Sequence, residues 1–259
     1  MAKIEMKTIK NLKYCEQNNE NLDVYLPEKT GFTTVVCFHG GGLECHGKDA
    51  ENFVQIAESF VKAGYGFVSA NYRIYPQAKF PEFIQDAAAA LAFVKKKIKN
   101  EWEGNGDIIV TGQSAGAWLA LMLCLNKTYL NAVGINPLEI KAWIIDSAQT
   151  TAHFNVLRYE KGESPKLQRI NEYAPLYYVD ENTKFTKILL IVYENDMPCR
   201  YEQNMLFYKS ILAFNKNAEI SYQILPGGHC HGSSVKDSDG EYAYVKTAMK
   251  WLQNNNIDK

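Results

Sequence analysis

Short apolar runs alternate with longer helical segments along most of this chain. The runs predict strands, short and apolar as in a buried parallel sheet, at residues 33–38, 66–70, 107–110, 142–146, 187–193 and 219–225. The segments between them predict helices at residues 49–63, 80–99, 115–124, 201–214 and 241–253. Strands that alternate with helices indicate an α/β fold, with a mostly parallel sheet covered by helices on both faces.

Two parts of the chain depart from this alternation. Residues 3–9 and 22–26 predict two edge strands joined by a turn at residues 18–21. Residues 147–178 have poor periodicity and many Tyr, Arg and Glu residues. Loops of this length inside compact domains usually carry function or contain short helices. We therefore expect one domain over residues 1–259, in which residues 147–178 form a small cap over the functional site.

Composition narrows the function classes. The formal net charge is −1 without a basic block, so nothing indicates a nucleic-acid partner or an anionic membrane. Six cysteines are scattered without a C-x-x-C pair, which does not indicate a disulfide framework. The first residues do not form a signal peptide, and no apolar stretch reaches transmembrane length. The expected location is the cytoplasm.

The strongest motif is the segment Gly112-Gln113-Ser114-Ala115-Gly116. A strand-type run enters it and a helix-type run leaves it, which is the context that a nucleophile elbow requires. Such a turn exposes its apex side chain at the carboxyl end of the sheet. It also places that residue at a helix N-terminus, where N–H groups favour a developing anion. Ser114 is therefore the candidate nucleophile.

Three further segments complete a catalytic constellation. Asp196 follows one predicted strand and His229 follows the last, so the chain order Ser-Asp-His is the one expected for this kind of elbow. A serine hydroxyl needs a base to attack, and His229 oriented by Asp196 supplies one. The glycine run after His39 offers N–H groups which, with that of Ala115, would hold an oxyanion.

These motifs resemble the α/β-hydrolase esterases of the hormone-sensitive-lipase type and the neighbouring bacterial feruloyl and acetyl-xylan esterases. The residues concerned are His39-Gly40-Gly41-Gly42, Asn71-Tyr72-Arg73-Ile74-Tyr75-Pro76, Phe80-Pro81, Asp86-Ala87, Ser114, Asp196 and His229. The resemblance implies an α/β-hydrolase fold, a structural role for His39, and oxyanion donors at Gly41 and Gly42. It also implies a serine carboxylesterase for short acyl esters, such as acetylated or feruloylated sugars, that needs no cofactor or metal.

Alternatives exist for the acid and the base. The family often carries a glycine shortly before the aspartate, where this chain has Tyr193-Glu194-Asn195. Glu194 and Asp146 therefore compete with Asp196 for the acid role. His231 competes with His229, although the resemblance favours His229. A metal site of His229, Cys230 and His231 is disfavoured because adjacent side chains point in different directions.

Residues near the expected cap and glycine run admit two interpretations each. His153 is better interpreted as a surface histidine than as a residue that contacts substrate. His46 and Cys45 either line the acyl pocket or belong to an exposed loop with Glu44. Tyrosines in the cap suggest an aromatic lining, but aromatic residues fill cores at least as often. These tyrosines are Tyr159, Tyr173, Tyr177 and Tyr178.

Three rival functions share the same residues. A formamidase or other amidase uses the same chemistry, but such relatives often carry an aromatic residue after the glycine run, where this chain has Leu43. A non-catalytic α/β-hydrolase scaffold that binds a ligand typically lacks the serine or the histidine, whereas this chain has candidates for all three residues. Acyl transfer to an alcohol shares the acyl-enzyme. The acyl length, the alcohol and the oligomeric state stay open.

Overall fold

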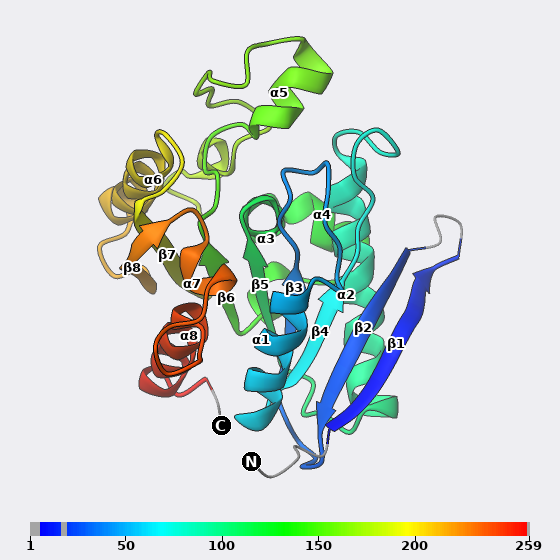
Figure 1. The fold of residues 1–259 in the computed structure, drawn as a ribbon. Coiled ribbons are helices and arrows are strands. Elements are labelled where there is room, and N and C mark those ends of the chain that lie inside the picture. Colours follow the sequence, from blue (N-terminus) through cyan, green and yellow to red (C-terminus); the bar gives the residue numbers. More distant parts are fainter. Residues whose placement is uncertain (1–5, 17–19, 258–259) are drawn as a thin grey trace.

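The sheet runs through the whole molecule. The computed structural model describes residues 6–16 and 20–257, and within these ranges eight strands form one sheet in the order β1-β2-β4-β3-β5-β6-β7-β8 (Figure 1). The strands are β1 (Met6–Cys15), β2 (Glu20–Pro27), β3 (Thr34–Phe38), β4 (Gly66–Ala70), β5 (Ile108–Gln113), β6 (Ala142–Asp146), β7 (Lys187–Asn195) and β8 (Ile220–Gly228). β2 pairs antiparallel with β1 and β4, and the remaining neighbours are parallel.

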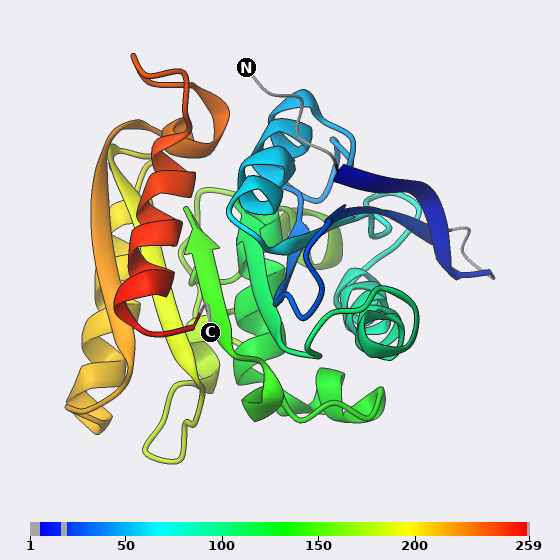
Figure 2. The same ribbon diagram turned by 90° about the horizontal axis from the view of Figure 1, so that it is seen from below.

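Helices cover both faces of this sheet. The helices are α1 (Glu51–Lys62), α2 (Glu82–Glu101), α3 (Ala115–Leu125), α4 (Lys127–Ala132), α5 (Phe154–Lys161), α6 (Arg200–Phe214), α7 (His231–Ser234) and α8 (Ala243–Asn254), with 3-10 turns η1 (Pro137–Glu139) and η2 (Pro175–Tyr178). α1 and α8 lie on one face, and α2, α3 and α6 lie on the other (Figure 2). None of the helices in the described ranges is both long and apolar enough to cross a membrane.

The central strands are apolar on both faces because each face has its own core. In β3, Val35 and Cys37 contribute to the cluster under α1 and α8, whereas Val36 and Phe38 contribute to the cluster under α2, α3 and α6. Successive side chains of a strand point to opposite faces, so a strand covered on both sides reads as one continuous apolar run. This confirms the α/β fold predicted from the sequence.

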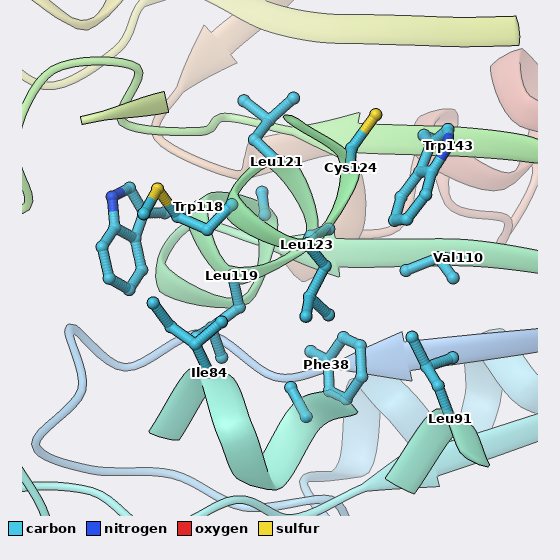
Figure 3. Packing of buried hydrophobic residues seen from close by; sticks show 14 of the residues in the cluster. Phe38, Ile84, Leu91, Val110, Trp118, Leu119, Leu121, Leu123, Cys124 and Trp143 are labelled. Carbon is cyan, nitrogen blue, oxygen red and sulfur yellow. The ribbon is translucent and has the colours of Figure 1, made fainter. Parts of the chain in front are cut away.

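α3 is the most deeply buried helix, since every residue from Ala115 to Leu125 is buried. Figure 3 shows its side chains between the sheet, represented by Phe38 and Val110, and α2, represented by Ile84. A helix that is apolar all round belongs in a core. This packing fixes the helix, and with it the turn that precedes it.

Several predicted boundaries were wrong. β1 continues to Cys15 instead of ending at residue 9, because an edge strand with one solvated side tolerates polar residues and register shifts. β8 includes the Pro-Gly-Gly segment that was expected to form a loop, since Gly228 pairs with Asn195. The short helices α4 and α7 were not predicted. Residues 3–5 of the first predicted strand and residues 18 and 19 of the predicted turn lie outside the described residues.

The expected cap segment, residues 147–178, contains α5 and η2. Figure 1 shows α5 beyond the end of the sheet toward which the parallel strands point. The segment is tied to the main body, because Trp118 Nε1 of α3 donates a hydrogen bond to the Tyr173 carbonyl over 3.0 Å. Its role as a cap over the site stays a prediction.

Candidate active site

Ser114 occupies a sharp turn between β5 and α3. Its backbone angles, φ 53° and ψ −110°, lie in a region that residues other than glycine rarely adopt. The turn is held because the Ser114 N–H donates to the Asp146 carbonyl over 2.8 Å, and the Trp118 N–H donates to the Ser114 carbonyl over 3.0 Å. The predicted strand-turn-helix context is present, with Ser114 at the N-terminus of α3.

The two glycines of the motif are required by close backbone contacts. A Cβ on Gly116 would lie 2.0 Å from the Phe38 carbonyl oxygen, and a Cβ on Gly112 would lie 2.2 Å from the Gly116 carbonyl oxygen. Neither neighbour is a flexible side chain. α3 therefore approaches β3 and β5 as closely as it does only because both positions lack a side chain.

Ser114, His229 and Asp196 form a hydrogen-bonded line. Nε2 of His229 lies 2.8 Å from Oγ of Ser114, and Nδ1 of His229 lies 2.5 Å from Oδ1 of Asp196. Asp196 follows β7 and His229 follows β8, so the parallel sheet brings together at one edge residues far apart in the chain. The structure thus joins the three residues singled out from the sequence through the imidazole of His229.

The surroundings keep Asp196 ionised. Burial alone raises the pKa of this carboxyl, but hydrogen bonds from His229 and Ser147 outweigh burial and hold the pKa below its usual value. The carboxylate accepts a third hydrogen bond from the Met197 N–H, which donates to Oδ1 over 2.7 Å. A carboxylate with these partners can orient an imidazole and stabilise its protonated form.

The glycine run after β3 forms a tight turn beside Ser114. Gly41 has a φ of 101°, and its carbonyl accepts hydrogen bonds from the N–H groups of Glu44 and Cys45. No hydrogen bond among the described residues uses the N–H of Gly41 or Gly42. The N–H of Ala115 opens α3 and has no intrahelical acceptor. Within the part of the chain that the structure describes, these three backbone donors therefore have no hydrogen-bond acceptor.

His39, the residue before the glycine run, is held in the core by Tyr72. It is buried, its ring stacks on Tyr72 at 4.3 Å, and the Tyr72 hydroxyl donates to the His39 carbonyl over 2.7 Å. Burial lowers the pKa of His39 to about 4, so its ring is neutral at physiological pH. These contacts suit a structural residue.

An open pocket of about 930 Å³ lies beside Ser114 and His229. The glycine run forms one wall, and the first turn of α1 and the segment after α7 form others. Hydrogen-bonding side chains line much of it, namely Glu44, His46, Glu51, Asn52, Gln55, Gln113, Ser234 and Lys236. Its apolar side chains include Phe53, Phe154, Met197 and Val235. The pocket therefore offers both hydrogen-bonding and apolar surface next to the candidate nucleophile.

The prediction of a surface position for His153 was wrong. The side chain is 1% exposed, and it accepts the Asn155 N–H at the N-terminus of α5 over 3.3 Å. Its ring stacks on Phe154 at 4.5 Å and packs against Trp118. Burial lowers the pKa of His153 to about 3. A capping role explains why a polar ring is buried here.

The cap tyrosines do not line the pocket. Tyr173 is buried in the core, Tyr159 donates its hydroxyl to Glu44, and Tyr177 is exposed. The suggested aromatic lining was therefore wrong for this pocket, whose only tyrosine among the described residues is Tyr242. His46 does line the pocket, whereas Cys45 is exposed and lies outside the lining.

The competing acid and base residues lie elsewhere. Asp146 is buried and accepts hydrogen bonds from Tyr193, over 2.8 Å, and from Ser233, over 2.5 Å. Glu194 and His231 are exposed. Among the described residues, no side-chain hydrogen bond joins the acid or imidazole group of any of these three to Ser114 or His229.

Two residues at the site were missed by reasoning from the sequence. Ser147 contacts both Asp196 and His229, and Asn155 of α5 donates to the Gly42 carbonyl over 2.7 Å. The only available signal for Ser147 was its place directly after a predicted strand. For Asn155 there was none, because a single Asn in an irregular segment has no distinctive pattern.

Metal-ligating residues do not cluster in the part of the chain that the structure describes: no group of three or more His, Cys, Asp or Glu is arranged to hold an ion. Cys230 is buried whereas His231 is exposed, and His229 already contacts Ser114 and Asp196.

Comparison with known proteins identifies the family of this chain. The BD-FAE family model matches residues 22–158, more than half of the chain. The chain belongs to the BD-FAE family. The resemblance predicted from the motifs is thereby confirmed at the level of the family. The matched region of this BD-FAE member contains the glycine run and Ser114 and ends before Asp196 and His229.

The individual relatives have low sequence identity to this chain and match only part of it. This BD-FAE member is 28% identical over 144 residues to a probable isoprenylcysteine alpha-carbonyl methylesterase of Oryza sativa subsp. japonica, covering 55% of this chain and 32% of the relative. It is 28% identical over 136 residues to a kynurenine formamidase of Meyerozyma guilliermondii, covering 52% of this chain and 50% of the relative. The chain thus spans half or less of the length of these relatives.

A solved structure has the same fold over its full length. A truncated form of a carbohydrate esterase from gut microbiota superimposes with a TM-score of 0.76 at 18% identity, covering 100% of this chain and 99% of the other. This similarity establishes the α/β-hydrolase fold of the BD-FAE member.

Proposed function

We propose that this protein is a carboxylic ester hydrolase that works through an acyl-enzyme on Ser114. In this mechanism Oγ of Ser114 attacks the ester carbonyl while Nε2 of His229 takes its proton. His229 then gives the proton to the leaving alcohol, and Asp196 orients the imidazole throughout. A water molecule, activated by the same imidazole, releases the acid and restores Ser114.

The negative charge that develops on the carbonyl oxygen needs donors fixed in advance. The N–H groups of Gly41, Gly42 and Ala115 fill this role in the proposal. Their positions on a tight turn and at a helix N-terminus favour an anion without rearrangement. Removal of one such donor typically slows an enzyme about 10²–10³-fold.

One observation carries the proposal, namely the line from Asp196 through His229 to Ser114, with contacts of 2.5 Å and 2.8 Å. Ser114 and His229 line a pocket, and the glycine run forms one of its walls. A serine on a strained turn, an imidazole on its hydroxyl and an ionised carboxylate behind the imidazole are the parts that a serine hydrolase needs.

For the substrate, we propose short acyl esters of hydroxyl-rich alcohols, such as acetyl or feruloyl esters of sugars. The pocket lining supports this class, because the polar side chains of Glu51, Asn52 and Lys236 lie beside apolar ones and can meet both the hydroxyl groups and the short acyl chain of such an ester. The structural similarity to a protein described as a carbohydrate esterase points the same way.

The test compares hydrolysis of p-nitrophenyl acetate, butyrate and octanoate by the wild type and three variants, each checked for folding. Ser114→Ala and His229→Ala should lower kcat by several orders of magnitude, on the order of 10⁴–10⁶, as in other serine hydrolases. His231→Ala is the matched control and should keep near-normal activity. If the wild type is inert and Ser114→Ala changes nothing, the proposal fails, and a ligand-binding scaffold becomes the better account.

A formamidase is the second candidate, favoured by the match to a kynurenine formamidase. Its chemistry needs the same Ser114, His229 and Asp196. The two candidates differ in kcat/KM, so N-formylkynurenine and an acetylated sugar should be compared under one set of conditions. A higher kcat/KM for the formamide would reverse the proposed preference.

A further inference from the structure

Ser147 contacts both the acid and the base of the proposed mechanism. It directly follows β6, and its side chain is fully buried. Its hydroxyl donates to Oδ2 of Asp196, and the same oxygen lies 3.0 Å from Nδ1 of His229. Oδ1 of Asp196, by contrast, faces Nδ1 of His229 directly. The hydroxyl therefore bridges the far oxygen of the carboxylate and the imidazole.

The backbone of Ser147 is fixed in a strained conformation. Its φ is 60°, in the left-handed region that residues other than glycine and asparagine rarely adopt. Its N–H donates to the Ile191 carbonyl over 2.8 Å, and its carbonyl accepts from Nη1 of the buried Arg200 over 2.6 Å. Strain of this kind persists where surrounding contacts impose it, and it clusters at functional sites.

The hydroxyl has one proton, and its geometry decides where that proton goes. Because the proton points to Asp196, only a lone pair of the oxygen can face Nδ1 of His229. This arrangement is satisfied when Nδ1 carries a hydrogen, and it disfavours the tautomer with the hydrogen on Nε2. The Nδ1–H tautomer leaves Nε2 free to accept the proton of Ser114.

We propose that Ser147 is a positioning residue, whose hydroxyl holds the Asp196 carboxylate and the Nδ1–H tautomer of His229 so that Nε2 faces Ser114. This inference rests on the proposed function, because it assigns a role within that mechanism. Ser147 acts through Asp196 and His229 and does not line the pocket.

Two substitutions separate the hydroxyl from the backbone strain. Ser147→Ala and Ser147→Gly both remove the hydroxyl, but glycine adopts a φ of 60° readily and alanine does not. Ser147→Gly should therefore have the higher Tm of the two. If the hydroxyl positions the imidazole, both variants should lose kcat equally, by about 10- to 100-fold, the scale of a lost hydrogen bond to a charged group.

The pH profile gives a readout that packing alone does not move. Without the Ser147 donor, Asp196 keeps more negative charge toward His229, which favours the imidazolium. The acid limb of kcat/KM should then move to higher pH in both variants. Ser69→Ala is the control, since it removes another buried hydroxyl, which belongs to β4 and donates to the Lys48 carbonyl in the segment before α1. That variant should keep the wild-type profile.

A second readout does not require ester turnover. The His229 Nδ1 proton should give a downfield ¹H NMR resonance in the wild type that shifts in both Ser147 variants and stays in place in Ser69→Ala. If the resonance and the pH profile are unchanged in the Ser147 variants, or if Ser147→Gly keeps the wild-type kcat, the proposed role of Ser147 is overturned. The proposed function fails separately, when the wild type itself hydrolyses no ester or formamide.

Discussion

At the scale of the residue, two neighbouring carboxyl groups ionise differently because their partners differ. Burial raises the pKa of Asp146 to about 7, although hydrogen bonds from Ser233 and Tyr193 lower it in part. Asp196 is also penalised by burial, but its bonds include one from His229, and its pKa ends below the usual value. The nature of the donors thus decides which carboxylate can stabilise an imidazolium.

The raised pKa of Asp146 predicts a pH dependence of stability. The unfolded carboxyl has a pKa of about 3.9, so the folded protein binds this proton more tightly between roughly pH 4 and pH 7. The wild type therefore loses stability from this group as the pH rises through that window. Asp146→Asn does not titrate, so its unfolding free energy should rise relative to the wild type between pH 5 and pH 8.

Urea unfolding of both proteins at pH 5 and pH 8 measures this change. The exposed Glu181→Gln is the matched control, and its difference from the wild type should be the same at both pH values. A constant difference for Asp146→Asn as well would contradict the assigned protonation.

At the scale of the element, α5 holds the glycine run in place. Asn155 Nδ2 donates to the Gly42 carbonyl over 2.7 Å and to Glu44 over 2.6 Å, and the Tyr159 hydroxyl also donates to Glu44. Asn155 is buried, so these hydrogen bonds are shielded from water. The helix that lies beyond the sheet edge is thus attached directly to the proposed oxyanion donors.

Asn155→Ala should lower kcat more than it raises KM. Without the hydrogen bonds from Asn155, the proposed oxyanion donors of the glycine run are less well positioned to stabilise the transition state. We expect a decrease of about 10- to 100-fold, less than the 10²–10³ of losing a donor outright. Steady-state kinetics on p-nitrophenyl acetate gives both constants. Arg158→Ala is the control on the same helix, since its exposed side chain lies 3.5 Å from Glu44, and it should behave like the wild type. Equal effects of the two substitutions would argue against this coupling.

At the scale of the whole molecule, the site depends on two cores on opposite faces of one sheet. α3 carries Ser114 at its start and is buried throughout, between the sheet and α2. Trp118 lies at the junction: its ring packs against Phe83 of α2, and its Nε1 donates to the Tyr173 carbonyl of the cap segment. The position of the elbow therefore depends on the packing of the largest core.

Trp118→Ala should destabilise the protein by about 3–5 kcal/mol, the usual cost of removing a buried large aromatic side chain. The substitution would leave a cavity beside α3, and it would also leave the Tyr173 carbonyl without its donor. Denaturant unfolding measures the loss. Phe214→Ala, at the exposed end of α6, is the comparison and should change stability by no more than about 0.5 kcal/mol. Similar losses in both variants would contradict the role of this junction.

The sequence by itself determined the fold class and the identity of the elbow. Both are local signals: apolar runs predict strands that are buried on both faces, and the G-x-S-x-G spacing reflects backbone contacts within one strand-turn-helix unit. The chain order of Ser114, Asp196 and His229 followed from the same pattern. Edge strands and turn boundaries were less well predicted, because β1 and β8 are set by pairing with a neighbour and not by their own apolar residues.

Only the tertiary structure decided which polar side chains meet. The contact between Ser114 and His229 spans 115 positions, that between Asn155 and Gly42 spans 113, and that between Ser147 and Asp196 spans 49. Such pairings depend on which elements lie side by side and on how each turn aims its side chain, and a linear pattern contains neither. For the same reason the sequence left His153 on the surface and did not single out Ser147, whose left-handed backbone points its hydroxyl at the acid and the base.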